Sequence, residues 1–307
     1  MNTTYNNNLA KSKERHIILD SLRGLALLGV CLANYSEFSL YSFLPEETKA
    51  AIPTAGIDTV LRYIQYFFID GKFYTIFSLL FGIGFSIMLS DSTQNNRNGL
   101  TIFYRRMIIL FFIGLFHLIF LWAGDILILY AFVGFFFPFF RNVSNKKLLI
   151  FSAIFIFLPV LMDACIVLFG WNMAVPVINA TEYFHAQAGI TEQNFPVWLA
   201  ENKSYIDVLK FNVAGSFIRL QEFIEGHRVF KVLGLFLLGL YIGRNKLYAK
   251  LQNNKALLKK VMKFGSAIGF PASLLYAWST MNNYLLGLVT HSLIYAISVV
   301  PLALTYI

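Results

Sequence analysis

Charged residues are scarce in this sequence of 307 residues. Only 13% are Asp, Glu, Lys or Arg, whereas a soluble globular domain has about 25%. Hydrophobic residues make up 57%, with 32 Phe, and the mean hydropathy is +0.62. Several apolar stretches reach the ~20 residues that a membrane-spanning helix needs. An open β-sheet could not satisfy its backbone hydrogen bonds in lipid. The sequence therefore predicts an all-α, polytopic membrane helix bundle.

Cysteine is equally rare, and its pattern argues against metal chemistry. The two thiols, Cys31 and Cys165, lie inside apolar runs, and the sequence has no CxxC motif or His/Cys cluster. We expect both thiols to be buried and to fill space, and we predict no metal site. The net charge of +9 does not indicate a nucleic-acid partner, because the basic residues follow the apolar segments. The basic stretch 244–263 favours either anionic lipid headgroups or an anionic cytosolic cofactor, and charge alone does not distinguish the two.

The apolar pattern predicts a single transmembrane domain over residues 17–307, preceded by a disordered cytoplasmic tail at 1–16. The first apolar run lacks a small-residue cleavage site, so we interpret it as an uncleaved anchor. Residues 56–69 are amphipathic and are expected to lie at the membrane interface. The polar segment 171–228 is expected to be extracytoplasmic or re-entrant. Eight transmembrane helices are predicted, at 17–37, 73–90, 106–123, 126–140, 147–169, 229–243, 262–280 and 285–305.

The distribution of Lys and Arg predicts the orientation. If the N-terminus is cytoplasmic, cytoplasmic segments hold 16 of the 25 basic residues and few acids, as the positive-inside rule requires. The protein is thus expected to be a multi-pass protein of the bacterial cytoplasmic membrane. These basic residues are Lys11, Lys13, Arg15, Arg97, Arg105, Arg106, Arg141, Lys146, Lys147, Arg244, Lys246, Lys250, Lys255, Lys259, Lys260 and Lys263.

Several polar residues lie within or beside the predicted spans. Asp20 and Arg23 are three residues apart and can pair on one helix face, either as a structural ion pair or with Arg23 available to an anionic ligand. Asn34 lies on nearly the same stripe, roughly 16 Å further along at 1.5 Å per residue. Asp70 and Lys72 open the second span. They are either a solvated turn, with Asp favoured by the helix dipole, or the lip of a polar site.

The tightest predicted hairpin places a histidine near a carboxylate. Asp125, in the break "AGD", can cap the helix that follows. His117 and Tyr130 each lie about 7–8 Å below the hairpin tip by helical rise. A His–Asp pair suits a general base with an orienting partner. The alternative is a core histidine bonded to a backbone carbonyl, with Asp125 acting only as a cap.

Two other polar or glycine-rich patterns are interpreted as structural. The glycines Gly82, Gly84, Gly234, Gly239 and Gly243 do not follow a strand or open a loop, so they indicate helix packing rather than a phosphate cradle. The run "QEFIEGHRVFK" at 221–231 is charged enough to be solvated.

Four motifs resemble the YeiB-like family of bacterial membrane proteins, which carry a domain of unknown function. They are "LDSLRGLALLGVCLAN" at 19–34, "GKFYTIFSLLFGIGF" at 71–85, "RRMIILFFIGLFHLIFLWAGDILILYA" at 105–131 and "FLLGLYIGR" at 236–244. The C-terminal Gly-Pro-x-Glu-x-x-Trp-Arg-type motif of that family is absent, and the sequence is expected to be a truncated form. The family is distantly similar to transmembrane acyltransferases through "LDSLRG". In the sugar O-acyltransferases a histidine follows the arginine by eleven positions, where this sequence has Asn34.

The resemblance implies an acyltransferase that moves an acyl group from cytosolic acyl-CoA to an extracytoplasmic or lipid-linked glycan or small-molecule acceptor. His117 is then the base, Asp125 orients it, and Arg23, Asn34, Asp70, Lys72 and Tyr130 contact substrate. These residues are expected to line one outward-opening cavity that reaches down to Arg23. The alternatives are a transporter or permease, with Asp20, Arg23 and His117 on its path, and a non-catalytic factor that binds a partner through 171–228.

Overall fold

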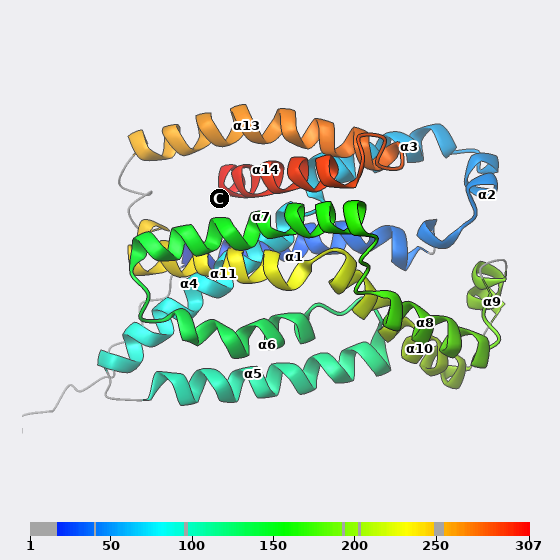
Figure 1. Cartoon of the computed structure of the whole chain (residues 1–307), viewed down its shortest axis with the longest axis horizontal. Helices are drawn as coiled ribbons and strands as arrows, with labels where there is room; N and C mark the ends of the chain where they lie inside the picture. The colour runs from blue at the N-terminus through cyan, green and yellow to red at the C-terminus, as the bar shows by residue number, and fades with distance from the viewer. Residues whose placement is uncertain (1–16, 40, 95–97, 192–193, 202–203, 249–254) are drawn as a thin grey trace, which may run out of the picture.

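The computed structural model describes residues 17–39, 41–94, 98–191, 194–201, 204–248 and 255–307. Every regular element in these ranges is helical (Figure 1), which confirms the predicted helix bundle. The elements are α1 (Ile17–Phe38), η1 (Tyr41–Phe43), α2 (Glu46–Ala51), α3 (Ala55–Ile64), η2 (Gln65–Ile69), α4 (Lys72–Gln94), α5 (Gly99–Phe116), η3 (His117–Leu121), α6 (Leu127–Phe136), η4 (Phe137–Phe140), α7 (Asn145–Phe169), α8 (Val175–Gln187), α9 (Phe195–Glu201), α10 (Tyr205–Glu225), α11 (Arg228–Arg244), α13 (Lys255–Met281) and α14 (Leu288–Tyr306).

Local residue chemistry sets where these helices begin and end. The side chain of Asn98 accepts a hydrogen bond from the amide of Thr101 and caps α5, as short polar residues do at helix starts. The helix α7 ends at Gly170, which adopts a left-handed φ of 66° that favours glycine. A second left-handed glycine, Gly71 with φ 76°, separates η2 from α4. Each of these turns redirects the chain into the bundle.

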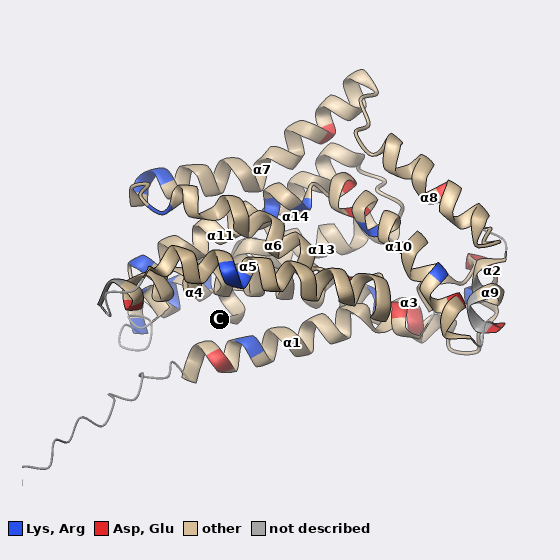
Figure 2. Cartoon of the chain, turned by 90° about the horizontal axis from the view of Figure 1, so that it is seen from below, with Lys and Arg blue, Asp and Glu red and all other residues tan. Residues whose placement is uncertain are grey.

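The helices α4 and α11 form the centre of the bundle. In Figure 1, α7, α13 and α14 lie on one side of this pair and the α5–α6 hairpin lies on the other. The helices α8, α9 and α10 gather at one end of the molecule. Lys and Arg gather at the opposite end, where α7 begins and α4 ends (Figure 2). We call the end that carries Arg106, Lys147, Arg244 and Lys246 the basic end, and the end with the α5–α6 loop at 122–126 the distal end.

Glycine allows the central pair to approach closely. A Cβ atom added at Gly82 would lie 2.2 Å from the carbonyl oxygen of Phe236, and one at Gly239 would lie 2.2 Å from that of Leu79. Small residues permit such contact between membrane helices, where association depends on packing rather than on water exclusion. The interpretation as packing residues is confirmed for Gly82 and Gly239, and likewise for Gly234 and Gly243, but not for Gly84, whose added Cβ would have only the Arg23 guanidinium within 4 Å.

Aromatic rings fill the space beside the central pair. The rings of Phe81 and Phe236 stack with centroids 4.2 Å apart, and Phe85, Phe103 and Phe137 pack around them. Aromatic pairs of this kind contribute about 0.5–1.5 kcal/mol each beyond simple burial. Large apolar side chains also cover the outside of α1, α5 and α7, including Leu28, Phe112, Phe116, Leu161 and Leu168. Such exteriors suit contact with lipid.

The number of predicted spans is not confirmed. Within the described residues, five helices are long and apolar enough to cross a membrane: Ile17–Phe38, Ala55–Ser92, Gly99–Leu121, Asn145–Phe169 and Leu288–Tyr306. The apolar helix Leu127–Phe140 is shorter, and α11 has only 17 residues. The helix α13 has 27 residues but is less apolar, since four lysines lie within its first nine residues. The prediction counted these weaker segments as full spans.

The prediction that both cysteines are buried is wrong. Cys31 and Cys165 are exposed free thiols, because they lie on outward faces of α1 and α7 rather than in the core. The segment 56–69 forms α3 and a π-helical turn, which the Asp70–Gly71 turn separates from α4, and its interfacial position stays a prediction. The predicted tail 1–16, with Lys11, Lys13 and Arg15, lies outside the described residues, as do Arg97 and Lys250.

Candidate functional site

One large cavity runs along the bundle between α1, α4, α5, α6, α10 and α11. Its volume is about 2310 Å³, whereas pockets for drug-sized ligands are ~300–1,000 Å³. On α1 its lining extends from Leu19 to Glu37, a distance of roughly 27 Å at 1.5 Å per residue. The hydrocarbon layer of a bilayer is about 30 Å thick. The cavity therefore reaches from the basic end to the distal end along a path of membrane dimensions.

Cationic side chains dominate the basic end of the cavity. Arg23, Arg106, Arg244 and Lys246 line it here, against the two carboxylates of Asp20 and Asp91. Nη1 of Arg23 donates to Oδ1 of Asp20 at 2.7 Å, and both side chains are only partly buried. The predicted ion pair is therefore present. It faces the cavity beside Gly84, whose missing Cβ would lie 3.9 Å from the Arg23 guanidinium.

Arg244 fixes the wall of this basic end. Its guanidinium donates to the carbonyl of Val143 at 2.6 Å and also to those of Phe140 and Arg141. These carbonyls lie at the end of the 3₁₀ turn η4 and just after it, where backbone acceptors often lack helical partners; that of Phe140 also accepts from the amide of Val143. The contact ties the α6–α7 connection to α11. Arg23, Arg106 and Lys246 are the other cations that line the basic end of the cavity.

The His117–Asp125 pair lies at the distal end of the cavity. The helix α5 changes to a π-helical turn at His117, which is a common local feature of functional sites. Nδ1 of His117 lies 3.0 Å from Oδ2 of Asp125. Asp125 is almost fully buried, and its Oδ1 accepts from the amide of Ile128 at 2.8 Å. Asp125 thus caps α6 and contacts His117 at the same time.

The charge state of Asp125 reflects this position in the 122–126 loop. Burial raises the pKa of its carboxyl, because the charged form loses solvation there. The amide of Ile128, His117 and Arg219 oppose this effect. The side chain of His117 keeps about 31% of its surface exposed and lines the cavity. An accessible imidazole thus lies within ion-pair distance of a buried carboxyl, although Nδ1 of His117 and Oδ2 of Asp125 do not have the geometry of a hydrogen bond.

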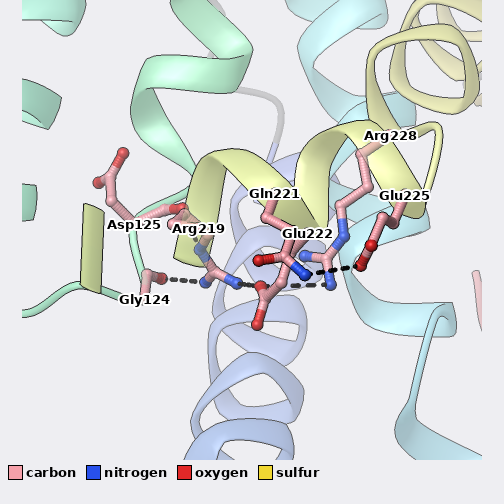
Figure 3. A network of polar contacts seen from close by, with 7 residues as sticks. All are labelled: Gly124, Asp125, Arg219, Gln221, Glu222, Glu225 and Arg228. Atoms are coloured by element: carbon pink, nitrogen blue, oxygen red, sulfur yellow. Dashed lines mark hydrogen bonds and ion pairs between the residues drawn. The ribbon is translucent and has the colours of Figure 1, made fainter. Parts of the chain in front are cut away.

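Arg219 of α10 holds the loop that carries Asp125 (Figure 3). Its Nε donates to the carbonyl of Asp125 at 2.8 Å, Nη2 donates to the carbonyl of Gly124, and Nη1 pairs with Glu222. Arg228 approaches the same Glu222 carboxylate at 3.8 Å. Arginine suits this role because its planar guanidinium presents several donors in fixed directions.

Most of the predicted site residues line the same cavity. Asn34 and Asp70 are at the wall of its distal half, and Tyr130 lies deeper. The amide of Asn34 donates to the carbonyl of Val30 in its own helix. The hydroxyl of Tyr130 lies 2.7 Å from Oγ of Ser78 and donates to the carbonyl of Tyr74. Tyr130 therefore contacts α4 instead of the His117–Asp125 pair.

Lys72 is the exception among the predicted residues. It is fully buried, does not line the cavity, and donates to the carbonyl of Tyr66 at 2.7 Å. The π turn explains this position, because the amide of Asp70 donates to Gln65 instead of to Tyr66. The ammonium satisfies the carbonyl that this turn leaves available. The prediction that Lys72 forms part of an outer lip is wrong.

The distal end also contains residues that sequence reasoning did not single out. Glu37, Arg219, Glu222 and Arg228 all line the cavity, although 221–231 was interpreted as a solvated run. That interpretation is wrong for His227, which is 4% exposed. The spacing of Arg219 and Glu222 allows a pair on α10, but the sequence gives no sign that α10 packs against the α5–α6 loop.

Comparisons with known proteins relate the chain to uncharacterized bacterial proteins. YxaH of Bacillus subtilis (strain 168) is 26% identical over 277 residues, covering 87% of this chain and 67% of that protein. A 39.9 kDa protein from the amylase 3′ region of Bacillus acidopullulyticus is 36% identical over 156 residues, with 48% and 42% coverage. YeiB of Escherichia coli (strain K12) is 34% identical over 125 residues, with 39% and 30% coverage.

These similarities support the YeiB-like resemblance read from the sequence. The chain spans less than half the length of two of these three relatives. No family model matches the chain, and no solved structure matches it. All three relatives are described as uncharacterized, so they bring no activity to this chain, and the similarity to acyltransferases stays a prediction.

Proposed function

We propose that the chain is an integral membrane acyltransferase that uses a cytosolic acyl-CoA and an acceptor on the opposite side of the membrane. The observation that supports this most is the single cavity with different chemistry at its two ends. Cations gather at one end, and the His117–Asp125 pair lies at the other. We place the basic end in the cytoplasm, in line with the positive-inside rule, and take α6, α11 and α13 as additional crossings.

The donor site in this proposal is the basic end. A coenzyme A thioester carries several phosphate charges, and arginine binds phosphate through paired, charge-assisted hydrogen bonds. Arg23 and Arg106 face the cavity, with Lys246 beside them. Arg23 would exchange part of its pairing with Asp20 for contact with the anionic donor. The apolar middle of the cavity, with Leu27, Phe77 and Leu110, would shield the thioester arm from lipid and water.

The chemistry in this proposal takes place at the distal end. Neutral His117 would take a proton from an acceptor hydroxyl or amine as that group attacks the acyl carbonyl. The carbon–sulfur bond breaks, and the thiolate leaves with a proton supplied by the imidazolium. Asp125 would hold the ring and stabilise its charged form, as carboxylates do for catalytic histidines. Arg219 would fix Asp125 through the backbone of the loop.

Binding and transfer can be separated experimentally. Acetyl-CoA binding to the purified chain is measured by calorimetry, and transfer of labelled acetyl to a panel of glycan, lipid and amine acceptors is measured in parallel. Arg23→Gln should weaken binding. His117→Ala should retain binding and lower transfer by about 10²–10⁴-fold. His185→Ala on α8, which lies outside the cavity, is the matched control and should change neither.

A cavity that reaches both ends of the bundle also suits a transporter, which is the second candidate. A folded chain that binds no acetyl-CoA would contradict the acyltransferase proposal. Gradient-dependent flux of a solute into liposomes, lost on substitution of cavity residues, would then support transport. A chain that shows neither activity and tolerates both substitutions would favour the non-catalytic factor.

A further inference from the structure

A second polar cluster lies behind the cavity, in the packed interior between α4, α7, α11, α13 and α14. Its centre is Asp163, a carboxylate in the C-terminal third of the apolar helix α7 that is only 2% exposed. Oδ1 of Asp163 lies 2.8 Å from Nε2 of His227, and Oδ2 accepts from the hydroxyl of Ser292. Ionisable groups inside spanning helices are costly and are functional more often than structural.

The order of the contacts excludes a hydrolytic triad. In such a triad the histidine lies between the serine and the carboxylate. Here the carboxylate lies between the serine and the histidine, so Ser292 is a donor to Asp163 and is not activated by His227. The remaining nitrogen of His227, Nδ1, is buried and has no hydrogen-bond partner among the described residues. A proton on both ring nitrogens would therefore leave one of them unpaired.

A strained turn places His227 in this cluster. The chain passes from α10 to α11 through His227, whose φ of 48° is unusual for a residue with a side chain. Lys231 follows one turn later, and side chains four residues apart share a helix face. The ammonium of Lys231 lies 4.4 Å from the ring centre of Tyr295. No ion pair of Lys231 is present in the described part of the chain.

Tyrosine hydroxyls connect this cluster to the main cavity. The hydroxyl of Tyr295 donates to that of Tyr74 at 3.0 Å, and Tyr74 lines the cavity. A small void of about 10 Å³ lies between Tyr74, Lys231 and Tyr295. A void of roughly 10–15 Å³ with two to four polar partners can hold one water molecule. One water there would join the lysine to the hydroxyl pair.

We propose that Asp163, held by His227 and Ser292, is a proton-binding carboxyl that exchanges its proton with the main cavity by way of Lys231, Tyr295 and Tyr74. Each hydroxyl passes on its own proton as it receives another, so the tyrosines are unchanged after a transfer. Asp163 gains or loses the proton, and Ser292 and His227 remain its partners in both states. The site goes beyond acyl transfer, which moves no net proton into the bundle, and it does not depend on that activity.

Other charged groups face this route and would act on its protonation. Arg228 precedes Lys231 on the same helix, and His291 of α14 donates to or accepts from Ser279 at 3.0 Å. Asp70 accepts from the hydroxyl of Tyr276 on α13, whose ring lies 5.2 Å from that of Tyr295. Asp70 also lines the cavity. Binding of a charged ligand in the cavity would therefore change the field at the buried carboxyl.

Infrared difference spectroscopy on the chain in lipid nanodiscs tests the proton site. Acidification should produce a protonated-carboxyl band that is absent in Asp163→Asn and retained in Asp58→Asn, a control at an exposed site on α3. Ser292→Ala should move the frequency of this band, because it removes a donor to the carboxyl. A folded Asp163→Asn protein with an unchanged spectrum would overturn the proposal. If Asp163→Asn does not fold, a protonated-carboxyl band at the same frequency in Ser292→Ala and in the unsubstituted chain would overturn the proposal.

The connection to the cavity has its own measurement. After transfer to D₂O, the hydrogen–deuterium exchange of the Asp163 carboxyl should be at least about tenfold slower in Tyr74→Phe than in the unsubstituted chain. A tenfold lower rate corresponds to an activation free energy that is higher by ~1.4 kcal/mol. Tyr35→Phe, at an exposed tyrosine outside the cavity, should exchange like the unsubstituted chain. Equal exchange in all three proteins would contradict a route through Tyr74.

Discussion

Arg219 offers the sharpest test of how the distal end is held. Its side chain is only 11% exposed and contacts two backbone carbonyls and one carboxylate. Hydrogen bonds to charged groups are worth about 1.5–3 kcal/mol each, whereas the ion pair itself adds about 0–1 kcal/mol because the Glu222 carboxylate is 40% exposed. Glutamine at this position can replace one of the three contacts. We expect Arg219→Gln to lower the free energy of unfolding by about 2–4 kcal/mol.

Arg228 provides the matched control, since it approaches the same Glu222 carboxylate from the next helix. Its contact is longer, at 3.8 Å, and its side chain is 38% exposed. Exposed ion pairs are worth about 0–1 kcal/mol, so Arg228→Gln should cost at most about 1 kcal/mol.

The assay is the apparent thermal unfolding midpoint of the purified chain in one detergent. At about 2–4 °C per kcal/mol, Arg219→Gln should lower the midpoint by about 4–16 °C and Arg228→Gln by a few degrees at most. If acyl transfer is detected, it should fall in Arg219→Gln even below its unfolding temperature, because Asp125 loses its anchor. Equal midpoints for the two variants would refute the assignment of Arg219 as the residue that holds the loop.

Two further predictions concern packing and orientation. Gly82→Ala should destabilise the chain by about 1–3 kcal/mol, as overpacking does, because its Cβ would meet backbone of α11 at 2.2 Å. Gly24→Ala, which has nothing within 4 Å, should be neutral or stabilise by about 0.5–1 kcal/mol; a lower unfolding midpoint for Gly24→Ala than for Gly82→Ala would contradict the packing argument. In a chain with Cys31 and Cys165 replaced by Ala, Glu47→Cys should react with an impermeant maleimide added outside intact cells, and Lys147→Cys should react only after lysis. Labelling of Lys147→Cys in intact cells would reverse the proposed orientation.

The sequence by itself determined the class of the fold and two pairs of neighbouring polar residues. Low charge and long apolar runs require a helical membrane bundle, because only helices satisfy their backbone within one segment in lipid. Short-range spacing placed Asp20 beside Arg23 and His117 near Asp125, since residues three or a few positions apart are constrained by helix and hairpin geometry. Both pairs are present in the structure.

Only the tertiary structure decided which distant residues share a site. Arg219 lies 94 residues from Asp125, and Ser292 lies 129 residues from Asp163, so no local pattern could bring them together. The direction of Lys72 depends on a π turn whose unpaired carbonyl attracts the ammonium, and Cys31 points outward because of how α1 docks on α4. Helix packing in lipid selects among faces that are almost equally apolar, and for this reason periodicity alone could not choose the buried side.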